Sequence, residues 1–147
     1  MQGEITMDKI YVVYWSQTGN TEAMANAIAE GLSEAGKEAA VVTPSEVTAD
    51  ELKAATAFAI GSPAMGAEVL EEEEIEPLVT EIEGDVSGKK ILLFGSYGWG
   101  DGEWMRSWVE RMTNAGATVI GGEDAICQDA PDDDMVNTLK ALAKELA

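Results

Sequence analysis

Residues 10–21, IYVVYWSQTGNT, join an apolar run to a polar loop, and the fold class can be inferred from this junction. Its first part, Ile10–Trp15, is a continuous apolar run, which is typical of a strand buried on both faces. The polar part leads into a helical pattern whose apolar residues have the spacing i, i+3, i+4 and i+7: Ala25, Ile28, Ala29 and Leu32. Gly36 is the expected end of that helix. A buried strand that runs through a polar loop into a helix is the first unit of a parallel sheet.

The same alternation continues along the chain. Further apolar runs predict strands at Ala39–Thr43, Ala57–Gly61 and Ile91–Gly95, and a last strand broken into Thr118–Ile120 and Ala125–Cys127. Further helical patterns lie roughly at 73–83, with Pro77 in the first turn, at 105–112, which Gly116 ends, and at 135–146. Because strands and helices alternate and crossovers are right-handed, we predict an α/β fold, a doubly wound five-stranded parallel sheet with helices on both faces. We expect residues 7–147 to form a single domain, and residues 1–6 to be a loose N-terminal extension or a remnant of cloning.

The chain is strongly acidic and contains no histidine. It has 28 acidic residues against 9 basic ones, a formal net charge of −19. Such a surface repels nucleic acid and anionic membranes and attracts basic proteins. Solubility alone is an alternative explanation of the acidity. The lack of histidine removes the usual general base and the commonest metal ligand.

The cysteine content and the apolar runs favour a cytoplasmic protein. Cys127 is the only cysteine, so no internal disulfide can form and a reducing compartment fits. The apolar runs are too short to cross a membrane, and no signal segment opens the chain. We expect a monomer without a membrane or nucleic-acid partner.

Doubly wound sheets bind ligands beyond the carboxyl ends of their strands, so the loops after the first, third and fourth strands are the candidate site. The first loop consists of Ser16, Gln17, Thr18, Gly19, Asn20 and Thr21. Its hydroxyls and its amide precede a helix N-terminus, where free N–H groups bind anions. It matches neither the Walker A nor the Gly-x-Gly-x-x-Gly pattern. An N-capped helix after a tight loop is the structural alternative.

The other two loops carry groups that suit a flat ring. The loop after the third strand contains Ala64, Met65, Gly66, Ala67 and Glu68. Methionine packs well against aromatic surfaces, and the glutamate offers an acceptor for a ring N–H. The loop after the fourth strand contains Ser96, Tyr97, Gly98, Trp99, Gly100, Asp101 and Gly102. An indole on a glycine-rich loop suits stacking on a heteroaromatic ring. An ordinary loop with a core methionine, and an aromatic lid on the next helix, are the structural alternatives.

Together the three loops resemble those of the flavodoxin family. Ser-x-Thr-Gly-Asn-Thr at 16–21 is similar to the flavodoxin phosphate loop, and the stretches at 65–68 and 96–102 are similar to the flavin loops of the short-chain, clostridial type. The resemblance implies the strand order 2-1-3-4-5 and one FMN, bound non-covalently. It implies that residues 16–21 hold the phosphate, largely through backbone N–H groups.

For the flavin ring, the resemblance implies a role for each of the other two loops. It places Met65 against the inner face, Glu68 at the flavin N3–H and Trp99 over the outer face. Backbone N–H groups near Gly98 and Gly100 would contact the pyrimidine edge, with Asp101 as a nearby negative charge. The sequence departs from the family at Ala67, where the family has an acidic residue.

The resemblance implies a low-potential one-electron carrier rather than an enzyme. It would shuttle electrons between redox enzymes through the semiquinone/hydroquinone couple of FMN, and dock transiently on basic surfaces of redox partner proteins. The alternative is an FMN-dependent quinone or nitro reductase on the same fold, which needs space above the ring that Trp99 is expected to fill. A phosphorylated receiver domain does not fit, because the places of its acidic residues hold Trp15-Ser16 and Ser62-Pro63.

Four weaker features complete the prediction. The segment Gln128–Pro131 is a candidate to close one side of the site. The acids at Glu68, Glu71–Glu74 and Glu76 indicate a solvated helix start, to which the resemblance adds a docking surface. We expect Trp15 and Trp104 to be packing residues, and Cys127 to be a buried thiol.

Overall fold

The computed structural model describes residues 9–66 and 69–147, and in these ranges five strands form one sheet. The strands are β1 (Lys9–Tyr14), β2 (Glu38–Val42), β3 (Ala57–Gly61), β4 (Lys90–Tyr97) and β5 (Thr118–Gln128). They are hydrogen-bonded in the order β2-β1-β3-β4-β5, and each neighbouring pair is parallel. The predicted fold class and strand order are therefore confirmed.

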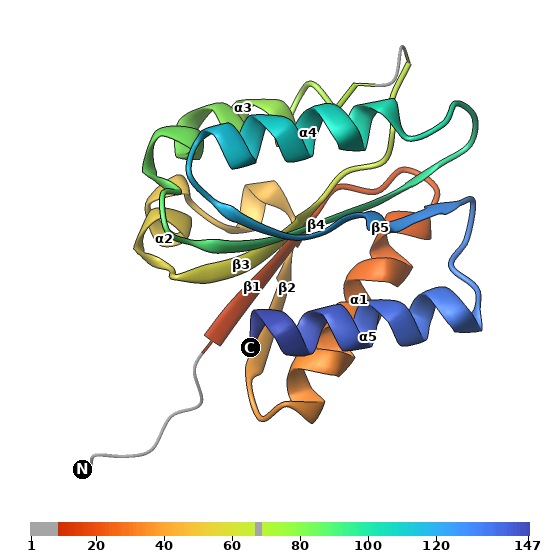
Figure 1. Ribbon diagram of the computed structural model, residues 1–147, viewed down its shortest axis with the longest axis horizontal. Helices are drawn as coiled ribbons and strands as arrows, with labels where there is room; N and C mark the ends of the chain where they lie inside the picture. Colours follow the sequence, from red (N-terminus) through yellow and green to blue (C-terminus); the bar gives the residue numbers. More distant parts are fainter. Residues whose placement is uncertain (1–8, 67–68) are drawn as a thin grey trace.

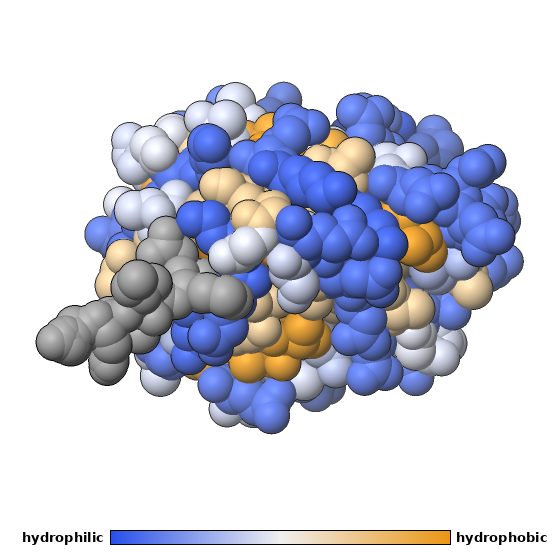
Figure 2. Space-filling view, turned by 90° about the horizontal axis from the view of Figure 1, so that it is seen from below, coloured by the Kyte–Doolittle hydropathy of each residue, from blue (hydrophilic) through white to orange (hydrophobic). Residues whose placement is uncertain are grey.

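Helices cover both faces of this sheet, as Figure 1 shows. Helices α1 (Asn20–Glu34) and α5 (Asp133–Leu146) lie on one face, and α3 (Ile75–Ile82) and α4 (Glu103–Asn114) lie on the other, beside the short α2 (Ala49–Ala54). Short 3₁₀ helices, η1 (Pro44–Glu46) and η2 (Glu83–Asp85), follow β2 and α3. The outer side of α1 and α5 is mostly hydrophilic in Figure 2. Between the two helices, Lys140 of α5 pairs with Glu30 of α1 at 2.6 Å and with Glu34 of α1 at 3.3 Å.

The core follows from the alternation of side chains along the strands. Neighbouring residues of a strand point to opposite faces, so Leu92 packs toward α1 and α5 while Leu93 packs toward α3 and α4. The helices complete each layer with large buried side chains, Met24 and Ile28 on one face, Trp104 and Trp108 on the other.

Helices α1 and α4 end just before the predicted glycines. Both glycines have the left-handed backbone conformation that favours this residue. Gly36 has φ +84° and Gly116 has φ +100°. In each case the next residue donates its N–H back into the helix, Lys37 to the carbonyl of Leu32 at 3.0 Å and Ala117 to that of Met112 at 3.1 Å.

Strand β5 differs from its prediction, because it runs from Thr118 to Gln128 without a gap. The predicted break in this strand is found only in its pairing with β4, and not in the strand itself. Leu93 pairs with Gly121, and the next pair joins Gly95 to Ile126, so the intervening residues of β5 leave the regular ladder. Gly121 and Gly122, at φ +81° and +65°, let the chain turn out of the sheet at this point.

Helix α3 begins later than predicted, because a buried acid sets its start. The carboxylate of Glu71 accepts hydrogen bonds from the backbone N–H groups of Glu73, Glu74 and Ile75, at 2.8–2.9 Å. Glu71 is only 3% exposed, so it is a cap rather than a solvated acid. Glu72 and Glu73 are exposed, as expected. Pro77 lies in the first turn of α3.

Candidate functional site

The predicted loops meet at the carboxyl ends of β1, β3 and β4, the central strands of the sheet. A cavity of about 140 Å³ lies between them. Its lining combines residues of all three loops with the segment after β5: Gln17, Thr18, Asn20, Thr21, Pro63, Ala64, Met65, Tyr97, Gly98 and Asp129. The topology thus brings together segments that lie far apart in the sequence.

The first loop folds around the hydroxyl of Ser16. Its Oγ accepts hydrogen bonds from the N–H groups of Gly19, at 3.0 Å, and Glu22, at 3.4 Å. The N-cap of α1 is Gly19 at φ +95°, which has no side chain to cap the helix. The N–H groups at the start of α1 therefore suit an anion, held by neutral donors and the positive end of the helix dipole.

Thr21 and Ser96 belong to the predicted site but are buried, at 1% and 5% exposure. Their hydroxyl oxygens lie 3.1 Å apart and share a hydrogen bond. This bond ties the start of α1 to the end of β4, and so fixes the first loop relative to the third.

The loop after β3 continues alongside β4 and then turns back on itself. Ala64 donates its N–H to the carbonyl of Ser96 at 3.0 Å. Met65 and Val69 then exchange two backbone hydrogen bonds, of 2.9 and 3.0 Å, around a turn in which Gly66 has φ +42°. Ala67 and Glu68, which were also predicted as site residues, lie outside the described residues.

The loop after β4 presents Trp99 to solvent with 63% of its surface exposed. Tyr97, in contrast, packs on Trp104 with ring centroids 5.7 Å apart. The segment after β5 supports this loop, since Asp129 donates its N–H to the carbonyl of Tyr97 at 2.9 Å and the Gln128 side chain donates to the carbonyl of Gly98 at 3.3 Å. The segment 128–131 thus borders the site, as the sequence suggested.

Asp101, expected from the sequence as a negative charge near the flavin, is part of an ion-pair network. Its carboxylate lies 2.9 Å from a guanidinium nitrogen of Arg106. Arg106 also pairs with Glu103 at 3.2 Å and with Glu123 at 3.3 Å. The hydrogen bonds to Asp101, then Glu103 and Glu123, raise the pKa of Arg106 above its ordinary value.

A sequence model of the flavodoxin family matches residues 12–141. The chain belongs to the flavodoxin family. It is 51% identical to the flavodoxin of Clostridium beijerinckii over 83% of this chain and 88% of the relative, and 46% identical to that of Megasphaera elsdenii over 84% and 88%. The solution structure of two-electron reduced Megasphaera elsdenii flavodoxin has a TM-score of 0.84 at 42% identity, covering 92% of this chain and 98% of that one.

The predicted family, function and cofactor are thus confirmed. The chain is a flavodoxin of the short-chain type, and flavodoxins bind FMN and carry electrons. The geometry fits this cofactor, since the start of α1, whose N-cap is a glycine, suits a phosphate, and Met65 and Trp99 offer apolar surface for a ring. In the described ranges of this flavodoxin, no helix is long and apolar enough to cross a membrane.

Trp15, expected to be a packing residue, and Cys127, expected to be a buried thiol, are both only half-buried in this flavodoxin. Trp15 is half-buried and donates its indole N–H to the carboxylate of Glu74 at 3.0 Å. It lines a second hollow, of about 380 Å³, together with Ser16, Gln17 and Gly19 of the phosphate loop. Cys127 is half-buried rather than buried, and desolvation raises the pKa of its thiol to about 11. The thiol therefore stays protonated at neutral pH.

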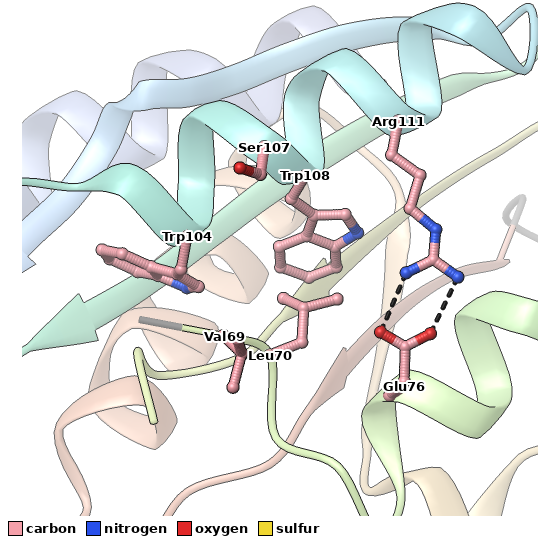
Figure 3. Close-up of a pocket in the computed structure, with 7 residues that line it drawn as sticks. All are labelled: Val69, Leu70, Glu76, Trp104, Ser107, Trp108 and Arg111. Carbon is pink, nitrogen blue, oxygen red and sulfur yellow. Dashed lines mark hydrogen bonds and ion pairs between the residues drawn. The ribbon is translucent and has the colours of Figure 1, made fainter. Parts of the chain in front are cut away.

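A separate cavity, of about 190 Å³, lies between α4 and the segment that follows the Met65–Val69 turn. Figure 3 shows Trp104 and Trp108 on one side of it, Val69 and Leu70 below, and the Arg111–Glu76 ion pair as its polar wall. Among the described residues, none lines both this cavity and the one between the three loops. Arg111 also pairs with Glu83 at 2.9 Å, so this part of α4 is held to α3 and η2.

Proposed function

We propose that this flavodoxin is a low-potential one-electron carrier that holds FMN non-covalently between the loops at 16–21, 64–68 and 96–102. The observation that carries the proposal is a cavity whose lining includes residues of all three loops. FMN supplies the chemistry, since its ring system takes up and releases electrons one at a time. The chain supplies binding, orientation and electrostatics.

The phosphate is assigned to the first loop. The first loop leads into the start of α1, where backbone N–H groups and the helix dipole suit an anion. The residues assigned to the phosphate are Ser16, Thr18, Gly19, Asn20 and Thr21. The Ser16 hydroxyl shapes the loop through its bonds to Gly19 and Glu22, and Thr21 fastens it to β4 through Ser96. Gln17 lines both neighbouring hollows and contributes a side-chain amide.

The ring is assigned to the second and third loops. Met65 and Gly98 line the cavity, and Trp99, the residue after Gly98, is exposed. A cavity of about 140 Å³ encloses only part of a cofactor as large as FMN. Trp99 offers apolar surface for the remainder, which keeps part of the ring system within reach of a partner protein.

The charge distribution supports docking on basic surfaces of redox partners. Lysines gather toward the amino ends of the strands: Lys9, Lys37, Lys53, Lys89 and Lys90. Exposed acids lie around the site at the carboxyl ends: Glu22, Glu72, Glu73, Asp101, Glu103 and Asp129. The exposed acids beside the site attract a basic partner during encounter. We further propose that the chain works as a cytoplasmic monomer, and that residues 7–147 form its single domain.

The carrier and the enzyme differ in whether NAD(P)H alone sustains turnover. We expect the FMN-free protein to take up FMN and become yellow, with quenched flavin fluorescence. With NADH or NADPH as the only reductant, the loaded protein should not reduce quinones or nitroaromatic compounds in steady state. Adding a flavodoxin reductase should start electron flow to an acceptor protein. Sustained turnover without the reductase would identify an enzyme and contradict the proposal.

Trp99→Ala is expected to weaken FMN binding about tenfold, because it removes stacking and burial of an aromatic surface. It should also raise the potential of the more reducing of the two one-electron couples, since an electron-rich indole disfavours additional negative charge nearby. Fluorescence titration and a redox titration measure the two effects. Val69→Ala is the control, because Val69 is also exposed, at 40%, and is not assigned to the ring. Unchanged affinity and potential in Trp99→Ala would show that Trp99 does not contact FMN.

A further inference from the structure

Arg106 lies in the first turn of α4, directly after the loop that carries Trp99. Its guanidinium makes two contacts with the same loop residue. One nitrogen donates to the backbone carbonyl of Asp101 at 2.9 Å, and the other donates to the Asp101 carboxylate at 2.9 Å. A carboxylate contact alone would hold only a side chain. The carbonyl contact holds the backbone, and so fixes the path of the loop.

The other end of this contact network lies on β5. Arg106 donates to the carboxylate of Glu123 at 3.3 Å. Glu123 belongs to the irregular part of β5, which leaves the ladder after Gly121. The irregular segment therefore has a structural consequence, because it offers an acid that ties α4 and the site loop to the edge of the sheet.

Gly102 shows how closely the loop is folded against α4. It is buried, at φ +93°, and it accepts the N–H groups of Met105 and Arg106 through its carbonyl at 3.0 and 3.1 Å. A Cβ at this position would lie 3.0 Å from Ile126 and 3.6 Å from the Arg106 guanidinium. The turn that leads from Trp99 into α4 therefore requires glycine at position 102, and the Arg106 side chain lies next to this turn.

The charge of Arg106 is a second, separable effect. It offsets part of the negative charge of Asp101, Glu103 and Glu123 beside the loop. A positive charge near a group that gains an electron favours its reduction. Arg111, on the same helix, is bound instead to Glu76 and Glu83 on the side of α3.

We infer that Arg106 is a positioning residue, which holds the loop between β4 and α4, residues 98–102, in place for FMN and raises the potential of the bound cofactor by its charge. This inference rests on the proposed FMN site. Arg106 thus has two proposed effects, positioning of the loop and a change in redox potential, and two substitutions separate them. Lysine keeps the positive charge but lacks the planar guanidinium that reaches two oxygens of Asp101.

Arg106→Gln removes both the fork and the charge. In the FMN-free protein we expect amide hydrogen exchange across 98–103 to speed up about fivefold, the scale of an exposed ion-pair network. In the loaded protein FMN should dissociate several times faster, and the potential of the more reducing couple should fall. Arg106→Lys should show the same faster exchange but keep the potential of the unmodified protein. Arg111→Gln, the matched control, should leave the loop exchange unchanged.

Unchanged exchange in Arg106→Gln, or an equal increase in Arg111→Gln, would overturn the positioning role. An equal fall in potential in Arg106→Lys and Arg106→Gln would overturn the role of the charge. The exchange measurement uses FMN-free protein. Failure of FMN to bind would therefore refute the proposed function and the effect on potential, while the positioning of the loop would still be decided by exchange.

Discussion

FMN is expected to bind at least about a hundredfold more tightly than riboflavin, because hydrogen bonds to a charged group contribute about 1.5–3 kcal/mol each and the start of α1 offers more than one N–H. FAD is also expected to bind weakly, since the loop has no second glycine-rich motif for a dinucleotide. Quenching of flavin fluorescence on titration with FMN-free protein gives the affinities for all three. Equal affinities for FMN and riboflavin would contradict the assignment of residues 16–21 to a phosphate.

Ser16→Ala tests the same assignment from the protein side. Removing Oγ leaves the N–H groups of Gly19 and Glu22 without the acceptor that shapes the loop. We expect the affinity for FMN to fall about tenfold, the cost of one lost hydrogen bond in a site that binds a charged group, and the affinity for riboflavin to stay the same. The preference for FMN should therefore shrink.

Ser45→Ala is the matched control. Ser45 lines the adjoining hollow, but its hydroxyl contacts Thr43 rather than the phosphate loop. It should leave both affinities unchanged. A parallel loss of FMN and riboflavin binding in Ser16→Ala would indicate general damage to the site instead of a role at the phosphate.

The fold was predictable because its information is local. The strand Ala57–Gly61 has the predicted bounds, and the other strand starts lie within one residue of their apolar runs. These strands are buried on both faces, so hydrophobicity alone marks them. The short helix α2 received no prediction of its own, although Thr48 and Glu51 form a capping box that is readable in the sequence.

The parts of the site that could not be predicted depend on contacts between distant residues. Glu71 looks like one acid in a row of four, and only the fold shows that it is buried and caps α3. Likewise, Thr21 and Ser96 are 75 positions apart. The pairing of Arg106 with Glu123 requires the irregular segment of β5, whose path depends on its register with β4.

Gly95→Ala is expected to cost about 3 kcal/mol or more of stability, because it adds a methyl group where the backbone leaves no room. Gly95 lies in β4 beside the residue that follows β3, and a Cβ there would overlap the carbonyl oxygen of Ser62. That oxygen is part of the backbone and accepts the indole N–H of Trp104 at 3.1 Å. Relief of the overlap therefore requires the end of β3 to move away from β4.

The same movement would separate two loops of the FMN site, since Pro63–Met65 follows β3 and Ser96–Gly102 begins at the end of β4. Gly95→Ala should thus lose FMN affinity in addition to stability. Urea unfolding of the FMN-free protein measures the change in the free energy of unfolding without any contribution from FMN binding. Gly84→Ala is the control, because a Cβ at Gly84 meets no atom within 4 Å and should change stability by no more than about 0.5 kcal/mol. If Gly95→Ala unfolds at the same urea concentration as the unmodified protein, the close contact between β3 and β4 does not constrain this position.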